Sequence, residues 1–163
     1  MISLYRIDDR VIHGQTMLKL LPQYPCDGII IIDDDISQNK QLFQIYKQVV
    51  PASLRVLCFS AEKAAEKLPE AVASKKKYII IFKGIGTIKE LFEKGYKIKD
   101  TISVGTASKK SDAKYIIEGF ALNDEEITMF DELDDQGYQF SIIPMGGVKR
   151  TVSWKEIRKR QRR

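Results

Sequence analysis

The sequence has few of the residues that build metal centres and nucleophilic triads, since its 163 residues include one histidine and two cysteines. Cys26 and Cys58 stand at no metal-ligand spacing, which argues against a zinc cluster or a disulfide framework and favours free, buried thiols. The chain has no serine or cysteine at nucleophile-elbow spacing and no Walker-type glycine-rich loop. We therefore expect a protein that uses no metal and no cofactor.

Long hydrophobic segments are also absent. The longest apolar stretch, Gly28–Ile32, is far shorter than the ~20 residues that cross a bilayer, and the N-terminus lacks a basic region followed by an apolar run. Apolar residues make up 44% of the chain and charged residues 30%, a mixture typical of soluble globular proteins. The length fits one domain, so we expect a single-domain cytoplasmic protein.

The positive charge is concentrated at the C-terminus. The net charge is +5, but the segment from residue 149 onward holds eight basic residues and one acidic residue, Glu156, so the rest of the chain is weakly negative. A basic tail of this kind attracts RNA, anionic lipid or an acidic partner protein, and it is equally typical of a solvated terminal helix. The weakly negative body and the lack of an aromatic stacking pattern argue against a nucleic-acid-binding protein.

Apolar runs of strand length alternate along the chain with helix-length segments of mixed polarity. This pattern predicts an α/β fold in which helices cover both faces of an open, mostly parallel sheet. Chemistry in such sheets gathers in the loops that follow the strands. These loops begin near Asp8, Asp33, Lys83 and Gly105. The predicted strands are Ile2–Ile7, Gly28–Ile32, Leu54–Phe59, Tyr78–Phe82 and Gln139–Ile143; the predicted helices begin after His13 and span Asn39–Val50, Ala61–Leu68, Thr87–Lys94 and Asn123–Gly137, and Lys83–Gly86 is interpreted as a turn.

The single histidine, His13, lies at the predicted turn from the first strand to the first helix. Its imidazole supplies a ring nitrogen with an unperturbed pKa of ~6.5, which suits a nucleophile that is largely neutral near pH 7. A helix N-terminus offers backbone N–H groups to a phosphate, and Gly14 lets the backbone come close to it. Arg10 adds a bidentate guanidinium contact. Asp8 or Asp9 orients Arg10 or fixes the histidine tautomer, and the sequence does not decide which.

Residue chemistry alone also allows a structural role for His13, because a lone histidine beside the apolar Val11 and Ile12 is more often structural than catalytic. The segment RIDDRVIHGQ, residues 6–15, closely resembles the signature of the IIB component of the mannose/sorbose-type bacterial phosphoenolpyruvate-dependent sugar phosphotransferase system, whose usual form is approximately RIDDRLIHGQV. The resemblance covers roughly residues 1–145 and includes three further segments. These are the acidic turn Asp33–Asp35, the strand Tyr78–Lys83 that ends in Phe-Lys, and Ser103–Gly105.

The resemblance implies a phosphocarrier with His13 as the phosphorylated residue, on Nδ1. In this family the IIB protein takes a phosphoryl group from a phosphohistidine on a IIA protein and gives it to a sugar delivered by the membrane components IIC and IID. Such a protein works in the cytoplasm, in peripheral association with the membrane permease. The sugar and the oligomeric state, a homo-oligomer included, stay open. The residues expected to bind phosphate are Arg10, Gly14 and Gln15, and those expected to orient the site or face a partner are Arg6, Asp8 and Asp9.

The chain departs from the family pattern at Ser37–Lys40, where the family tends to have a small, acidic-rich turn, and in two further places. After Ser103–Gly105 the family commonly has a second glycine where this chain has Thr106, so a hydroxyl of Thr106 or Ser108 either donates to the phosphate or belongs to an ordinary surface loop. The last departure is the basic end, and we therefore divide the chain into a phosphocarrier IIB domain at residues 1–145 and a helical extension at 146–163. Two alternative functions stay open: a phosphohistidine regulatory relay without direct sugar phosphorylation, and an RNA-binding module that uses the tail.

Overall fold

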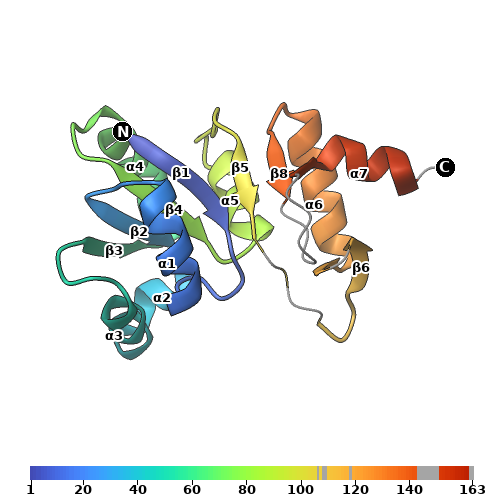
Figure 1. The fold of residues 1–163 in the computed structure, drawn as a ribbon. Helices are drawn as coiled ribbons and strands as arrows, with labels where there is room; N and C mark the ends of the chain where they lie inside the picture. The colour runs from blue at the N-terminus through green and yellow to red at the C-terminus, as the bar shows by residue number, and fades with distance from the viewer. Residues whose placement is uncertain (106, 108–109, 118, 143–150, 162–163) are drawn as a thin grey trace.

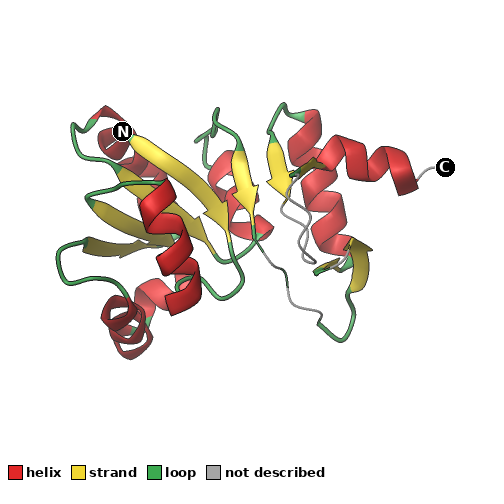
Figure 2. Ribbon diagram, in the orientation of Figure 1, coloured by secondary structure: helices red, strands yellow, loops and turns green. Residues whose placement is uncertain are grey.

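A seven-stranded sheet crosses the molecule, with helices on both of its faces (Figure 1, Figure 2). The computed structural model describes residues 1–105, 107, 110–117, 119–142 and 151–161, and of residues 15 and 16 it describes the backbone alone. The strand order is β3-β2-β4-β1-β5-β8-β9, in which β9 runs antiparallel to β8 and the pairings among the other strands are parallel. The strands of this sheet are β1 (Ile2–Ile7), β2 (Gly28–Ile32), β3 (Arg55–Phe59), β4 (Tyr78–Phe82), β5 (Ile102–Val104), β8 (Phe140–Ile142) and β9 (Val152–Ser153).

The helices form two layers. The first three helices pack on one face of the sheet, in a cluster with Leu4, Ile31 and Ile81, and the other four pack on the opposite face, in a cluster with Tyr5 and Phe82. The prediction of an open, mostly parallel sheet with helices on both faces is therefore confirmed. Within the described residues, no helix is long and apolar enough to cross a membrane. The helices are α1 (Gly14–Gln23), α2 (Asp34–Gln38), α3 (Lys40–Val49), α4 (Ala61–Ala73), α5 (Ile85–Glu93), α6 (Asp124–Asp135) and α7 (Trp154–Gln161).

The composition of the strands explains their places in the sheet. The central strands β2 and β4, with the sequences GIIII and YIIIF, are buried along their whole length, as β-branched strands covered on both faces are. In β5 the residues alternate, so that Ile102 and Val104 are buried while Ser103 is partly exposed. Parallel pairing brings the carboxyl ends of β1, β4 and β5 to one edge of the sheet, where the loops after Ile7 and Phe82 meet.

Helix α4 is longer than predicted. The predicted helix ends at Leu68, and the next residue, Pro69, lacks an N–H and crowds the preceding turn of a helix. In the structure the helix continues to Ala73, with Pro69 on its exposed side. Ala71 is buried on the same side as Leu68, so packing against the core carries the helix past the proline.

Helix α5 begins earlier than predicted, and the interpretation of Lys83–Gly86 as a turn is wrong for its second half. Gly84 is the N-cap residue, and Ile85 and Gly86 form the first turn of the helix. Ile85 is buried together with Ile88, one turn further along, and this burial outweighs the weak helix preference of Gly86.

Several short elements were not predicted. They are α2, β9 and a separate antiparallel hairpin, β6 (Lys114–Ile117) with β7 (Phe120–Leu122). The acidic turn at Asp33–Asp35 is the start of α2, because the Asp33 carboxylate caps this helix by accepting a hydrogen bond from the Ile36 N–H at 2.9 Å. Residue 143, at the end of the last predicted strand, lies outside the described residues. The two cysteines are free, as predicted, but they are half-buried rather than buried.

Helix α7 packs on α6 through the single tryptophan. The Trp154 ring is 1% exposed and stacks on Phe130 with a centroid distance of 4.8 Å. Its Nε1–H donates to Asp131 Oδ1 at 2.8 Å, and Arg158 donates to both oxygens of the same carboxylate at 3.0 and 2.7 Å. The beginning of the basic C-terminal segment is thus part of the packed core, while Lys159 on the same helix is exposed.

This packing predicts that Trp154→Ala lowers the free energy of unfolding by about 3–5 kcal/mol, because the change removes a large buried side chain and leaves a cavity. Chemical denaturation followed by circular dichroism measures the loss. The control is Lys155→Ala, an exposed neighbour on the same helix, which should unfold at nearly the wild-type denaturant concentration. Equal stability of the two variants would contradict the assignment of α7 to the packed core.

Candidate functional site

The loop between β1 and α1 is fixed by backbone hydrogen bonds and by buried side chains. The Asp8 N–H donates to the Phe82 carbonyl at 2.9 Å, and the Val11 N–H donates to the Asp8 carbonyl at 2.9 Å. Val11 and Ile12 are buried in the core cluster beneath α1. Val11 has φ +58, a conformation that is strained for a β-branched residue, and the burial of its side chain compensates for this strain. The chain between Asp8 and His13 therefore has a fixed path.

A buried ion pair lies beneath this loop. Asp8 is 1% exposed, and its Oδ2 accepts hydrogen bonds from Arg6 Nε at 3.1 Å and Nη2 at 2.8 Å. The other oxygen, Oδ1, accepts from the Arg10 backbone N–H at 3.2 Å. Both oxygens of the carboxylate are thus occupied, which is what a charge removed from water requires. Of the two predicted roles for Arg6, orienting the site fits this buried position and facing a partner does not.

Strand β5 closes the other side of the ion pair. Arg6 Nη1 donates a long hydrogen bond of 3.4 Å to Ser103 Oγ, and the Gly105 N–H donates to the Ile7 carbonyl at 2.8 Å. A Cβ atom at Gly105 would lie 2.9 Å from Asp8 Oδ2 and closer still to Arg6 Nη2. Only glycine fits here without moving the ion pair. Residue chemistry alone did not indicate this supporting role, although the position of Gly105 at the end of a strand was a signal.

His13 is the N-cap residue of α1, in an extended conformation and without a capping hydrogen bond from its side chain. The side chain is 22% exposed, and its Nε2 lies 4.0 Å from Asp8 Oδ2. This separation is too long for a hydrogen bond, but the nearby negative charge favours a proton on Nε2 and therefore a lone pair on Nδ1. Burial is the main effect that lowers the pKa of His13, the Arg10 charge lowers it further, and Asp8 acts in the opposite direction. The ring is therefore neutral at pH 7.

The remaining predicted residues surround His13 or lie outside the described part of the chain. Arg10 is exposed, and Gly14 is the exposed first residue of α1, with open space where a side chain would stand. Asp9 is half-buried, and its negative charge acts to raise the pKa of His13. Gln15 belongs to the first turn of α1, but its side chain lies outside the described residues, as do Thr106 and Ser108. Of the two aspartates, Asp8 has its carboxylate 4.0 Å from His13 Nε2.

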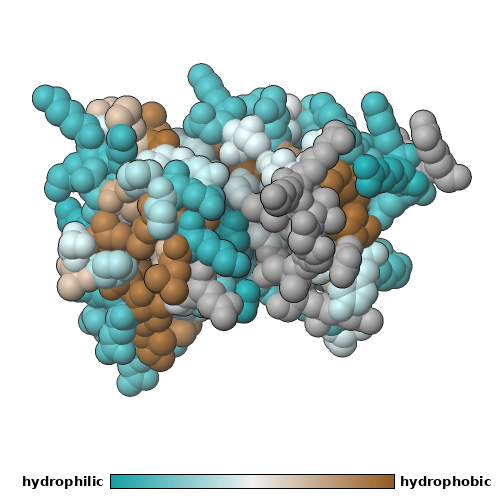
Figure 3. Space-filling model, viewed as in Figure 1, coloured by the Kyte–Doolittle hydropathy of each residue, from teal (hydrophilic) through white to brown (hydrophobic). Residues whose placement is uncertain are grey.

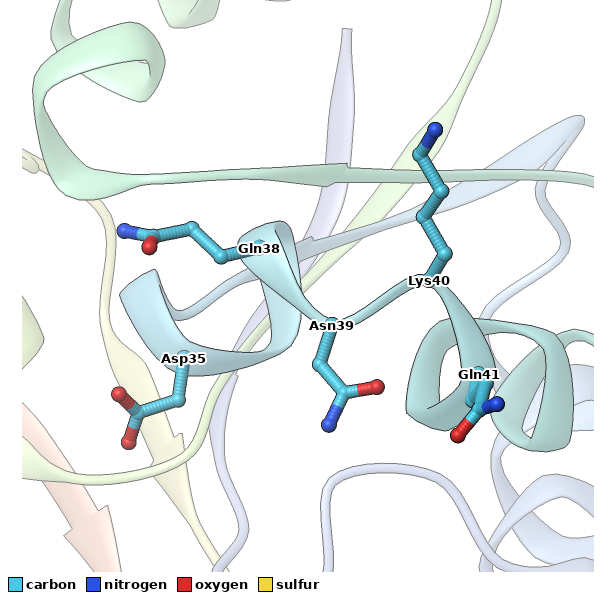
Figure 4. A pocket seen from close by; sticks show the side chains of 5 residues that line it. All are labelled: Asp35, Gln38, Asn39, Lys40 and Gln41. Carbon is cyan, nitrogen blue, oxygen red and sulfur yellow. The ribbon is translucent and has the colours of Figure 1, made fainter.

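One small cavity lies beside the loop, and a larger, open hollow lies away from it. A cavity of about 60 Å³ lies between Asp9, Lys83 and Lys110, beside the loop. A larger open hollow of about 590 Å³ lies where α2 meets α3, and its side chains point in different directions rather than toward a common centre (Figure 4). It contains none of the predicted site residues. Among the described residues, no group of three His, Cys, Asp or Glu side chains is placed to hold a metal ion.

The fold and the site together define a class of protein: an open α/β domain with a partly exposed histidine of lowered pKa at the N-terminus of a helix, at the carboxyl edge of the sheet. The comparisons with known proteins agree with this class. Residues 2–162 match the family described as the PTS system sorbose subfamily IIB component. The chain therefore belongs to this family of IIB components of the sugar phosphotransferase system, as its resemblance predicted.

Individual relatives and solved structures are also similar to this chain. The fructose-specific EIIB component of Bacillus subtilis is 28% identical over 141 residues, which cover 86% of each chain. The mannose-specific EIIAB component of Escherichia coli is 21% identical over 141 residues, which cover 86% of this chain and 43% of that longer protein. The crystal structure of manxB from Thermoanaerobacter tengcongensis has a TM-score of 0.84 at 25% identity and covers 98% of this chain and 95% of its own. The IIBSor domain of the sorbose permease from Klebsiella pneumoniae, at 23% identity, has the same fold with a TM-score of 0.85 and covers 98% of this chain and 97% of its own.

The charges around His13 predict how its pKa responds to substitution. Arg10→Gln should raise the pKa, because the neighbouring positive charge that disfavours the protonated ring is removed. Asp8→Asn should lower it, because a negative charge that favours the protonated ring is removed. Since the chain has one histidine, an NMR titration of the imidazole C–H signals reports this pKa without assignment. Lys19→Gln, an exposed cation on α1, is the control and should titrate like the wild type. Shifts of the opposite sign would contradict the charge arrangement.

The crowding at Gly105 predicts that Gly105→Ala lowers the free energy of unfolding by about 1–3 kcal/mol, because a Cβ there displaces the Arg6–Asp8 pair. It should also move the imidazole signals of His13, which lies beyond Asp8. Gly86→Ala is the matched control, since its nearest neighbour would be Met129 Sδ at an ordinary 3.9 Å. Denaturation and NMR spectra of the two variants check the prediction. If Gly105→Ala matched Gly86→Ala in both measurements, Gly105 would have no supporting role.

Proposed function

We propose that His13 carries a phosphoryl group, which it accepts from a phosphohistidine on a IIA protein and passes to a sugar held by the membrane components IIC and IID. The observation that supports this most strongly is the setting of the imidazole. His13 stands at the N-terminus of α1. Its side chain makes no capping hydrogen bond to the helix and is partly exposed. Membership in the IIB family agrees with this role.

The charge balance of the transfer fits the position of Asp8. Nδ1 of neutral His13 attacks the phosphorus of the donor phosphohistidine, a new N–P bond forms, and the N–P bond of the donor breaks. Because Nε2 keeps its proton, the phosphorylated ring becomes positively charged. The Asp8 carboxylate, 4.0 Å from Nε2, stabilises this charge. In the second step the oxygen of a sugar hydroxyl attacks the phosphorus and its proton is released to solvent, while the N–P bond breaks and the ring returns to its neutral form.

Three groups are placed to hold the phosphate. The Arg10 guanidinium supplies a charged, bidentate donor, and the exposed backbone at Gly14 lets the phosphate approach the helix. The first-turn N–H groups of α1, at Gly14 and Gln15, point out of the helix end and carry its positive dipole. Phosphoryl transfer passes through a loose transition state, so positioning and charge stabilisation supply most of the rate enhancement.

The same proposal places the protein in the cytoplasm, where it meets the IIA donor in solution and the permease at the membrane surface. The sugar would be bound by the permease; the described cavity beside the loop, at Asp9 and Lys83, measures only about 60 Å³ and has room for little more than water. Substrate choice would then belong to the permease rather than to this chain.

Incubation with phosphoenolpyruvate, the upstream carriers and a IIA protein tests the proposal. The wild type should gain one acid-labile phosphoryl group by intact mass, and His13→Ala should gain none, because no other side chain in the chain is an imidazole. Arg10→Gln should gain the group more slowly. Phosphate on His13→Ala would overturn the assignment, and phosphate that reaches the wild type but never passes to sugar in permease-bearing membranes would identify a regulatory relay instead.

A further inference from the structure

Helix α1 presents one large apolar side chain to solvent beside the site. Met17 and Leu20 are buried under the helix, whereas Leu18 is 78% exposed, the highest exposure of any large hydrophobic residue in the described part of the chain. In the space-filling view, apolar residues gather on this face of the molecule over α1 and α3 (Figure 3). A side chain of this size and exposure contributes nothing to the core, and its position is therefore informative about partners.

Helix geometry tilts the Leu18 side chain toward the N-terminal end of α1. Residue 18 lies one turn after Gly14 on the same face of α1, and side chains on a helix lean toward its N-terminus. Gly14 has no side chain, and the space where its Cβ would stand is open. Leu18 therefore lies on the solvent side of α1, one turn from the helix end that follows His13.

Two exposed cations lie near His13 and Leu18 along the chain. The exposed Arg10 precedes His13, and the exposed Lys19 lies next to Leu18. An incoming protein that carries a phosphate dianion is complementary to these two cations. Once the phosphoryl group has moved to His13, its negative charge offsets the positive charge of Arg10. The surface then attracts another phosphorylated protein less strongly. This change in charge favours a phosphodonor over a phosphoacceptor as the protein that docks here.

The size of protein interfaces gives a second argument. A standard interface covers about 800 Å² on each partner, which corresponds to a radius of about 16 Å. Leu18 follows His13 by five residues, or about 7.5 Å along the axis of α1. A protein of ordinary contact size that brings a phosphohistidine to His13 therefore covers Leu18 as well.

Resting on the proposed function, we infer that Leu18 is the apolar anchor of the docking surface for the phosphorylated IIA protein. This surface, which we call the donor face, consists of Leu18, Lys19, Arg10 and Gly14 around His13. Leu18 acts on recognition and not on the chemical step, because it is an aliphatic side chain with no group that bears on the phosphoryl transfer.

Transfer kinetics with two kinds of donor test this inference. For a phosphorylated IIA protein that phosphorylates the wild type, Leu18→Asp should raise the apparent KM roughly tenfold or more and leave kcat within about twofold, because an anion now faces an anionic partner on the donor face. With phosphoramidate, a small phosphoryl donor that needs no docking surface, the rate of His13 phosphorylation should equal that of the wild type. Leu18→Met, which keeps an apolar side chain, should retain most of the wild-type KM.

The matched control is Val72→Asp, which places the same charge on an exposed apolar residue of α4, on the opposite face of the sheet. It should leave both donors unaffected, and circular dichroism should show both variants folded. An unchanged KM in Leu18→Asp, or an equal slowing with both donors, would overturn the inference. So would normal KM with impaired sugar phosphorylation by permease-bearing membranes, which would assign Leu18 to the permease. Failure of both donors on the wild type would instead refute the proposed function.

Discussion

The buried ion pair of Arg6 and Asp8 is the interaction on which the site depends. Removing two charges from water is costly unless their hydrogen bonds are completed, and breaking one partner of such a pair typically costs about 3–5 kcal/mol. Here two neighbouring groups complete the hydrogen bonds of the Arg6–Asp8 pair. Ser103 on β5 accepts from Arg6, and the Arg10 N–H in the loop donates to Asp8. The carboxylate thus links the sheet to the loop and fixes the negative charge near His13.

The setting of the imidazole is a balance of opposing effects. Partial burial and the Arg10 charge lower the pKa of His13, while Asp8 raises it. The result suits a carrier in both of its states. A neutral ring retains a nucleophilic lone pair, and the Asp8 carboxylate, whose effect on the pKa of the free ring is outweighed by burial and Arg10, would stabilise the positive charge of a phosphorylated ring. Asp8 is therefore more useful 4.0 Å from Nε2 than in a tight ion pair, which would keep the free ring protonated.

How far the sequence predicts the site depends on how local the determining interactions are. His13, Arg10 and Gly14 were found from the strand-to-helix turn, since their positions follow from neighbours in the chain. The choice between Asp8 and Asp9 could not be made, because it depends on the backbone turn at Val11, and a positive φ at a β-branched residue is not expected from its type. Gly105 is more remote still. Its role requires knowing that β5 pairs with β1, almost a hundred residues earlier.

The fold shows the same division between local and distant determinants. The long apolar strands were predicted, because their composition alone buries them. The five-residue α2 and the three-residue β5 are too short for a periodic pattern, and they form because neighbouring elements hold them. Pro69 gives a related case. Proline disfavours the continuation of a helix, but Ala71, two residues further on, is buried in the core, and this packing favours a helix that continues past Pro69.

Helix α1 has a buried inner face and an exposed outer face that differ in their surroundings. Its inner face, with Met17 and Leu20, is buried against the sheet and fixes the helix N-terminus relative to the Arg6–Asp8 pair. Its outer face exposes Leu18, one turn from that N-terminus. A helix is stiff along its axis, and α1 also positions the imidazole. A protein that binds the outer face of α1 would therefore be held at a fixed position relative to the imidazole. For the phosphocarrier that we propose, docking on α1 would orient the transfer without any movement of the site.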